Sequence, residues 1–189
     1  MVIEQSLILL KPDAVQRNLI GKIISRFEDA GLKISAMKMV QPNKELAGKH
    51  YILDETWALK LFNRSKEAYE KEGKKMKFRD HIEMGNDIRN RNMVFLQEGP
   101  VVALVIEGPH AIELVRKMIG HTEPRQAIPG TIRGDFASIE SYTVSDSKGR
   151  VLRNLVHASD TPENAKREIA LWFNKNEVHN YKKDIDKHF

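Results

Sequence analysis

The stretch VVALVI, residues 101–106, decides the fold of this chain. Six apolar residues in a row are typical of a short strand buried on both faces, because a strand with one face in water alternates between apolar and polar residues. Gly99-Pro100 precedes the stretch and Gly108-Pro109 follows it, and both pairs interrupt regular structure. The sequence therefore predicts a central strand with the other elements arranged around it.

Three further strands are predicted from their own patterns. Leu7–Leu10 is a shorter apolar run that ends in Lys11-Pro12-Asp13, so Lys11 is expected at the exit of a buried strand. Residues 33–40 alternate between apolar and polar as far as Met39, as in a strand with one face in water. Residues 131–136 have a polar side and an apolar side and are predicted as the fourth strand.

Helices are predicted between and after these strands. The spacing of apolar residues on one helical face predicts helices over 18–30 and 109–120, each closed by a glycine. A short helix is expected over 44–51. A closing helix is expected to be capped by Asp160 or Thr161, with Pro162 in its first turn.

The order of these elements indicates the fold class. Strands and helices alternate with long connections, which favours an α/β or α+β sandwich with helices packed against a sheet. A ferredoxin-like α+β sandwich, in which a four-stranded antiparallel sheet is covered by helices, fits this order best. We expect one domain over residues 1–189, with a helical extension around 57–98 and a smaller one around 138–153. Within the first extension, Gly73 and Gly85 indicate turns between short helices.

Composition restricts the classes of protein to consider. The 189 residues are 41% apolar and 30% charged, as in ordinary globular proteins. No apolar run approaches the roughly 18 residues of a membrane span, and the N-terminus lacks a signal-peptide pattern, so a cytoplasmic protein is expected. The absence of cysteine excludes disulfides, thiolate metal sites and cysteine nucleophiles. A net charge of +5 is compatible with nucleic-acid binding or with a site for anionic phosphates.

The common nucleotide and hydrolase motifs are missing. The sequence contains no G-x-x-x-x-G-K-[ST], G-x-G-x-x-G, H-E-x-x-H or G-x-S-x-G. If the protein binds phosphate, it must do so with cationic side chains. Lys11 at the end of the first strand, Arg116 near the end of the third helix and Arg133 on the predicted fourth strand are candidates, and Thr122 adds a hydroxyl donor. Each of them alone is more often a surface residue.

His157 is the candidate for covalent chemistry. Imidazole is a nucleophile at neutral pH and a good leaving group once phosphorylated. A carboxylate on one ring nitrogen fixes the tautomer and leaves the other nitrogen free, and Glu168 on the following helix is the candidate for this role. A single histidine near a strand end is more often structural, so the neighbouring motifs decide between the two interpretations.

Taken together, six blocks resemble the nucleoside diphosphate kinase family. They are Lys11-Pro12-Asp13, Gly108, Arg116, Gly120-x-Thr122, Pro129-Gly130-Thr131-Ile132-Arg133-Gly134-Asp135-Phe136 and Asn154-x-x-His157-x-Ser159-Asp160. The last two blocks are highly specific, and the resemblance runs from the first strand to Trp172-Phe173. It departs from the family at the aromatic pair after Tyr51, where Trp57 and Phe62 are the nearest aromatic residues.

The resemblance implies a ping-pong transfer of the terminal phosphate of a nucleoside triphosphate to a nucleoside diphosphate. It implies that His157 is the nucleophile, that Glu168 orients its ring and that Ser159 supports it. Phosphate binding is implied for Lys11, Tyr51, Arg116, Thr122 and Arg133, and ribose binding for Asn154. Mg²⁺ is expected to arrive with the nucleotide, so no metal ligands are assigned to the chain. A homo-oligomer is implied, a hexamer or else a tetramer.

A different class of function competes with this interpretation. RNA-binding modules also use ferredoxin-like sheets, and the chain is basic. Such modules carry aromatic motifs on their strands, which this sequence lacks. We therefore expect neither nucleic-acid nor membrane binding, and the nucleic-acid module remains the alternative.

Overall fold

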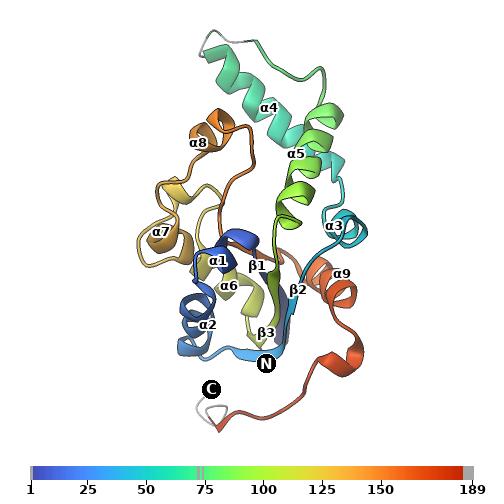
Figure 1. The fold of residues 1–189 in the computed structure, drawn as a ribbon, viewed down its shortest axis with the longest axis vertical. Coiled ribbons are helices and arrows are strands. Elements are labelled where there is room, and N and C mark those ends of the chain that lie inside the picture. The colour runs from blue at the N-terminus through green and yellow to red at the C-terminus, as the bar shows by residue number, and fades with distance from the viewer. Residues whose placement is uncertain (1, 72, 74, 185–189) are drawn as a thin grey trace.

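The computed structural model describes residues 2–71, 73 and 75–184, and Figure 1 shows their arrangement. Four strands form one antiparallel sheet in the order β2-β3-β1-β4. They are β1 (Ile3–Leu10), β2 (Lys33–Val40), β3 (Val101–Pro109) and β4 (Val156–Ala158). The stretch 101–106 is buried throughout and lies between β1 and β2, which confirms the predicted central strand.

Helices cover both faces of the sheet, so alternate residues of each strand enter two different cores. Ile8 and Leu10 of β1 belong to a core with α2 (Ile20–Asp29) and α6 (Ala111–Ile119). Leu7 and Leu9 belong to a second core with α3 (Lys44–His50) and α9 (Pro162–Trp172). This two-sided cover explains why the central strands are uniformly apolar, and it confirms the ferredoxin-like class.

The prediction of a fourth strand over 131–136 is wrong. These residues form α7 (Ile132–Phe136), where the Thr131 side chain caps the helix by accepting a hydrogen bond from Gly134 N. A polar and an apolar side over six residues suit one short helical turn as well as a strand, and the Thr131 cap decides between them. The fourth strand is instead β4, whose three residues are too few to show a periodic pattern.

The segment between α3 and β3 forms two long helices, α4 (Glu55–Lys71) and α5 (His81–Leu96). Figure 1 shows α4 and the first half of α5 projecting beyond the sheet. Gly85 lies inside α5, so the predicted turn there is wrong. A Cβ at this position would come within 2.7 Å of Leu53 Cδ1 and 3.0 Å of Ala58 Cβ. The glycine therefore allows close packing of the two segments rather than a turn.

The remaining elements are short. The helix α1 (Pro12–Gln16) follows directly on β1 at the predicted strand exit, and α8 (Tyr142–Ser147) lies in the segment 138–153. Single 3₁₀ turns occur at Pro124–Gln126 and Lys175–Glu177. After α9 the chain runs along β2, where His179 N donates to Ser35 O at 2.7 Å. Within the described residues no helix is both long enough and apolar enough to cross a membrane.

Candidate active site

The strand pairing places His157 on a defined face of the sheet. His157 lies opposite Leu9 in the β1–β4 ladder, and Leu9 faces the core formed with α3 and α9. The neighbours Val156 and Ala158 face the other core, because successive side chains of a strand alternate between faces. The imidazole is therefore directed toward α3 and α9, and its side chain is 22% exposed.

Glu168 of α9 approaches one nitrogen of this imidazole. Its Oε2 lies 3.1 Å from His157 Nε2 and accepts a hydrogen bond of 2.6 Å from Ser159 Oγ. Burial alone would raise the pKa of Glu168, but the hydrogen bonds from His157 and Ser159 lower it below its ordinary value. Glu168 is thus a carboxylate at neutral pH, which keeps the ring proton on Nε2 and leaves a lone pair on Nδ1.

The backbone before His157 is held in an unusual conformation. Leu155 has φ +67°, in the left-handed region that β- and γ-branched residues rarely adopt. Its N–H donates to Asp13 Oδ2 at 3.1 Å, and its carbonyl accepts from Lys11 N at 2.8 Å. Asp13 is itself largely buried, which raises its pKa. Through its hydrogen bond to Leu155 N, Asp13 fixes the turn that leads into β4, a role that sequence reasoning did not give it.

Lys11 and Asn154 lie next to this turn and contact each other. Lys11 Nζ donates to Asn154 Oδ1 at 2.7 Å, and Asn154 Nδ2 donates to the carbonyl of Thr122 at 2.9 Å. Burial, followed by the charge of Arg133, lowers the pKa of Lys11 to about 8. The Lys11 ammonium is therefore a poorly solvated cation that gains from an anionic partner.

Arg133 donates to three backbone carbonyls on two segments of the chain. Its Nε donates to Asn154 O at 3.1 Å, and its two terminal nitrogens donate to Gly120 O at 2.9 Å and Val156 O at 2.6 Å. Burial, followed by the charge of Arg116, lowers the pKa of Arg133 to about 10, so the guanidinium is charged at neutral pH. The residue reaches the site from α7, not from a strand as predicted.

Two predicted residues, Arg116 and Tyr51, stand outside this hydrogen-bonded network among the described residues, and a third, Thr122, joins it through its backbone. Arg116 is exposed on α6 and lines a cavity of about 760 Å³ that none of Lys11, Asn154 and His157 borders. Thr122 joins the network through its carbonyl only. The Tyr51 hydroxyl is buried without a partner among the described residues, and burial followed by the charge of Glu168 raises its pKa.

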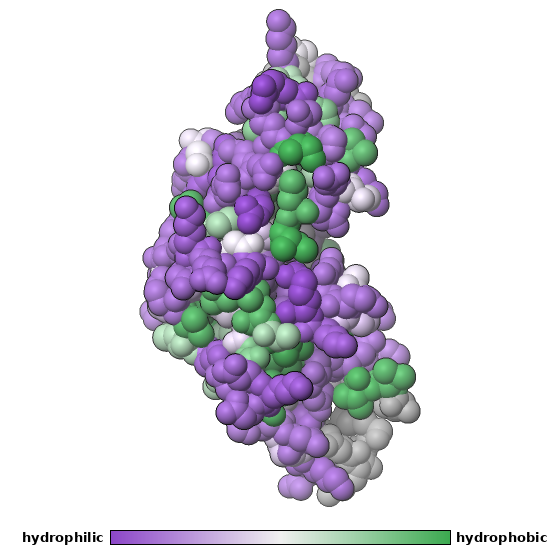
Figure 2. Space-filling model, turned by 90° about the vertical axis from the view of Figure 1, so that its right-hand side faces the viewer, coloured by the Kyte–Doolittle hydropathy of each residue, from purple (hydrophilic) through white to green (hydrophobic). Residues whose placement is uncertain are grey.

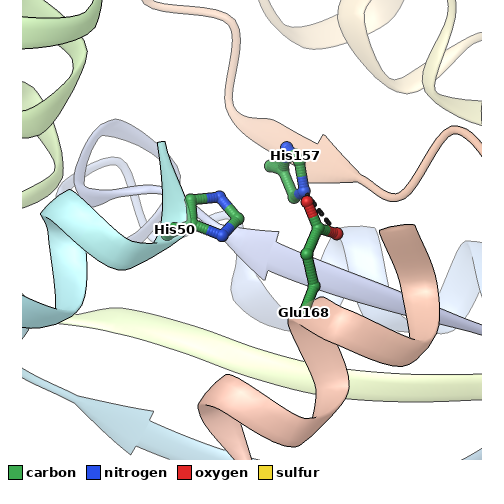
Figure 3. Close-up of side chains that lie close together, drawn as sticks. All are labelled: His50, His157 and Glu168. Atoms are coloured by element: carbon green, nitrogen blue, oxygen red, sulfur yellow. Dashed lines mark hydrogen bonds and ion pairs between the residues drawn. The ribbon is translucent and has the colours of Figure 1, made fainter. Parts of the chain in front are cut away.

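His50, at the end of α3, is a site residue that sequence reasoning missed. Its ring lies edge-on to that of His157 with centroids 4.5 Å apart. Figure 3 shows the two side chains on neighbouring elements. Trp172 Nε1 donates to His50 Nδ1 at 3.3 Å, whereas His50 Nε2 is buried without a partner among the described residues. Burial, followed by the charge of His157, lowers the pKa of His50 far below its usual value. In the sequence, only its position directly before the predicted site residue Tyr51 pointed to a role for His50.

Three of these residues could bind a metal ion, but their ligand atoms determine which ion fits. His50, His157 and Glu168 each offer a ligand atom, and these atoms lie within 4.8 Å of one another. Mg²⁺ prefers oxygen ligands and retains several waters, so two imidazoles do not suit it. The group therefore does not fit a resident Mg²⁺ ion.

The sequence of the chain is similar to a protein family and to curated relatives. The family model described as nucleoside diphosphate kinase matches residues 4–73 and 57–178, and the two segments overlap in α4. A nucleoside diphosphate kinase from Pyrobaculum aerophilum is 45% identical over 182 residues, covering 94% of this chain and 99% of the relative.

Two solved structures of this kind resemble the fold closely. The crystal structure of an NDP kinase from Pyrobaculum aerophilum superposes with a TM-score of 0.88 at 43% identity, covering 95% of this chain and 100% of that one. A transition-state mimic of nucleoside-diphosphate kinase from Borrelia burgdorferi, with bound vanadate and ADP, superposes with a TM-score of 0.80 at 38% identity. It covers 100% of this chain and 97% of that one.

Proposed function

The chain belongs to the nucleoside diphosphate kinase family, and we propose that it carries out the family's reaction through His157. It is a nucleoside-diphosphate kinase, which transfers the terminal phosphate of a nucleoside triphosphate to a nucleoside diphosphate. The observation that carries the assignment to His157 is the contact of its Nε2 with the ionised Glu168, which leaves Nδ1 as the nucleophilic nitrogen.

In the first half-reaction, the lone pair of His157 Nδ1 forms a bond to the γ-phosphorus. The bond from that phosphorus to the bridging oxygen breaks, and the nucleoside diphosphate leaves with the electron pair. The ring then carries a phosphoryl group on Nδ1 and a proton on Nε2, so it is cationic. Glu168 Oε2 lies 3.1 Å from Nε2 and stabilises this positive charge as it develops. The second half-reaction runs the same step in reverse with another nucleoside diphosphate.

Cations beside His157 supply the phosphate-binding part of the site. Lys11 and Arg133 are buried and partly desolvated, so they bind an anion more strongly than exposed cations do. Arg116 on α6 and the hydroxyls of Thr122 and Tyr51 add donors to this part of the site in the proposal. We assign ribose binding to Asn154, whose side-chain amide contacts Lys11 Nζ and the carbonyl of Thr122.

Mg²⁺ is part of the nucleotide substrate in this proposal. It neutralises phosphate charge and so lowers the barrier to transfer. The ADP and vanadate in the Borrelia burgdorferi structure support a nucleotide site of this class in a relative. The alternative of a nucleic-acid module finds no support in the described sheet, because helices cover both of its faces.

We further propose a cytoplasmic homo-oligomer, hexameric or else tetrameric. The strand β2 is at the edge of the sheet, and its residues Met37 and Met39 are each 58% exposed. Figure 2 shows a largely hydrophilic face interrupted by separate hydrophobic patches. Exposed apolar groups on an edge strand favour pairing with a second copy. Light scattering should give the mass of an oligomer, and a stable monomer would contradict this proposal.

The assignment of the nucleophile is tested by labelling. Incubation with γ-labelled ATP and Mg²⁺ should give a phosphoprotein that is labile in acid and stable in alkali. His157→Ala should abolish the label, whereas the control His81→Ala on α5 should retain it. A label that persists in His157→Ala would reject the assignment.

A further inference from the structure

We propose that His50, His157 and Glu168 bind a divalent transition-metal ion such as Zn²⁺, and that this ion switches the nucleophile off. The binding site follows from the three side chains themselves. Its inhibitory effect rests on the function proposed above for His157. Figure 3 shows the three residues, which come from α3, β4 and α9 and converge on one point.

The spacing of the ligand atoms is close to that of a zinc site. Zn²⁺ lies about 2.0–2.2 Å from nitrogen and oxygen ligands, so two ligands of a tetrahedral site are about 3.3 Å apart. His157 Nε2 and Glu168 Oε2 are already 3.1 Å apart. All three ligand atoms lie within 4.8 Å of one another, so small side-chain rotations are enough to close the site around an ion.

A buried polar atom without a partner points to a missing ligand here. His50 Nε2 is buried and has no hydrogen-bond partner among the described residues. The His50 ring packs edge-on against His157, and one of its nitrogens lies within 4.8 Å of ligand atoms of His157 and Glu168. Buried polar atoms normally find a partner, so an unpartnered imidazole nitrogen beside two further ligand atoms marks a place where something binds.

His50 is buried, with 3% of the residue exposed, and it gives up only one hydrogen bond when it binds a metal. Ligation through Nε2 moves the ring proton to Nδ1 and gives up the hydrogen bond from Trp172, which is long at 3.3 Å.

The surrounding charges determine which ions can bind. Lys11 and Arg167 are cations near the group, so simple charge attraction is weak and Mg²⁺ gains little. Zn²⁺, Co²⁺ and Cu²⁺ form strong bonds to imidazole nitrogen that do not depend on a negative site. We therefore expect selectivity for these ions over the Mg²⁺ that accompanies the nucleotide.

Metal binding at His157 Nε2 removes the nucleophilic lone pair of Nδ1, because it shifts the ring proton to that nitrogen. A neutral imidazole has one N–H and one lone pair. When the metal takes the lone pair of Nε2, the ring proton moves to Nδ1, so Nδ1 no longer has a lone pair for the γ-phosphorus. The contact between Nε2 and Glu168 is replaced by bonds from both groups to the same ion.

The test uses the complete, nucleotide-free protein and Co²⁺ as a spectroscopic probe. Wild type should bind one equivalent with the intense visible bands of tetrahedral Co²⁺, and Zn²⁺ should displace it. His50→Gln and His157→Ala should each weaken binding by about 100-fold or more, because loss of a direct ligand exceeds the 10–100-fold cost of losing an outer-shell partner. The control His110→Ala, which changes another histidine, should bind normally.

Two results would overturn the proposal: a wild type without a tetrahedral Co²⁺ spectrum, or a spectrum and affinity unchanged in both variants. His157 is half-buried, so its variant gives a result even if His50→Gln fails to fold. The readout does not depend on phosphotransfer. If Co²⁺ binds as described but labelling persists in His157→Ala, the metal site stands and the proposed nucleophile is wrong.

Discussion

Replacing Glu168 by glutamine tests the electrostatic part of the mechanism. Glutamine keeps the shape of the side chain, and its single amide oxygen can accept from either His157 Nε2 or Ser159 Oγ, which both donate to Oε2 in the wild type. The negative charge that stabilises the cationic phosphohistidine is lost. Because the Glu168 side chain is only 6% exposed, water replaces little of that stabilisation.

The expected size of the effect follows from hydrogen-bond energies. Hydrogen bonds to charged groups contribute about 1.5–3 kcal/mol, and neutral ones about 0.5–1.5 kcal/mol. The difference of about 1–1.5 kcal/mol corresponds to a loss of roughly 5- to 13-fold in rate. Glu168→Gln should therefore form phosphohistidine that many times more slowly in single-turnover quench-flow with γ-labelled ATP and Mg²⁺.

Glu163→Gln is the matched control, because Glu163 is an exposed carboxylate in the first turn of the same helix. Its labelling rate should equal that of the wild type. A wild-type rate in Glu168→Gln, or an equal loss in both variants, would refute the role of Glu168.

Three further predictions concern charge, packing and support of the site. Since burial lowers the pKa of Lys11 to about 8, its phosphate-binding charge is present below that pH and lost above it. ADP affinity should therefore fall as pH rises through about 8, and calorimetry on Lys11→Gln should show weak binding without this step. Gly85→Ala should lower the free energy of unfolding in urea by about 1–3 kcal/mol through overpacking, whereas Gly21→Ala, with open space around it, should raise it by about 0.5–1 kcal/mol. Ser159→Ala should lower the free energy of unfolding by about 1–3 kcal/mol. The cause is that the buried Leu7 N, which donates to Ser159 Oγ at 3.1 Å, loses its partner. Unchanged urea midpoints in the Gly85, Gly21 and Ser159 variants would contradict this reasoning.

Continuous patterns made most of the fold predictable. Helices bury both faces of the sheet, so β1 and β3 need apolar residues at successive positions. Such an uninterrupted apolar run can be recognised in the sequence. Single turns gave no such signal. Residues 131–136 form a helix through one side-chain cap, and β4 is three residues long, so neither has a period that sequence reasoning can detect.

The site was predictable to the extent that it depends on residue identity. His157, Glu168 and Ser159 lie in one hydrogen-bonded group, and Lys11, Asn154 and Arg133 lie in a second one. The roles of Asp13 and His50 depend on tertiary contacts instead. Asp13 is defined by a hydrogen bond to Leu155, 142 positions away, and His50 by its packing on His157 and Trp172. Local sequence patterns carry no information about such contacts.

The central claim is that phosphate passes through His157 in two separate steps. The most direct measurement is to label the protein with γ-labelled ATP and Mg²⁺, remove all nucleotide by gel filtration, and then add GDP and Mg²⁺. The mechanism predicts that the label leaves the protein and appears quantitatively in GTP. A label that stays on the protein, or that appears only as inorganic phosphate, would contradict the mechanism.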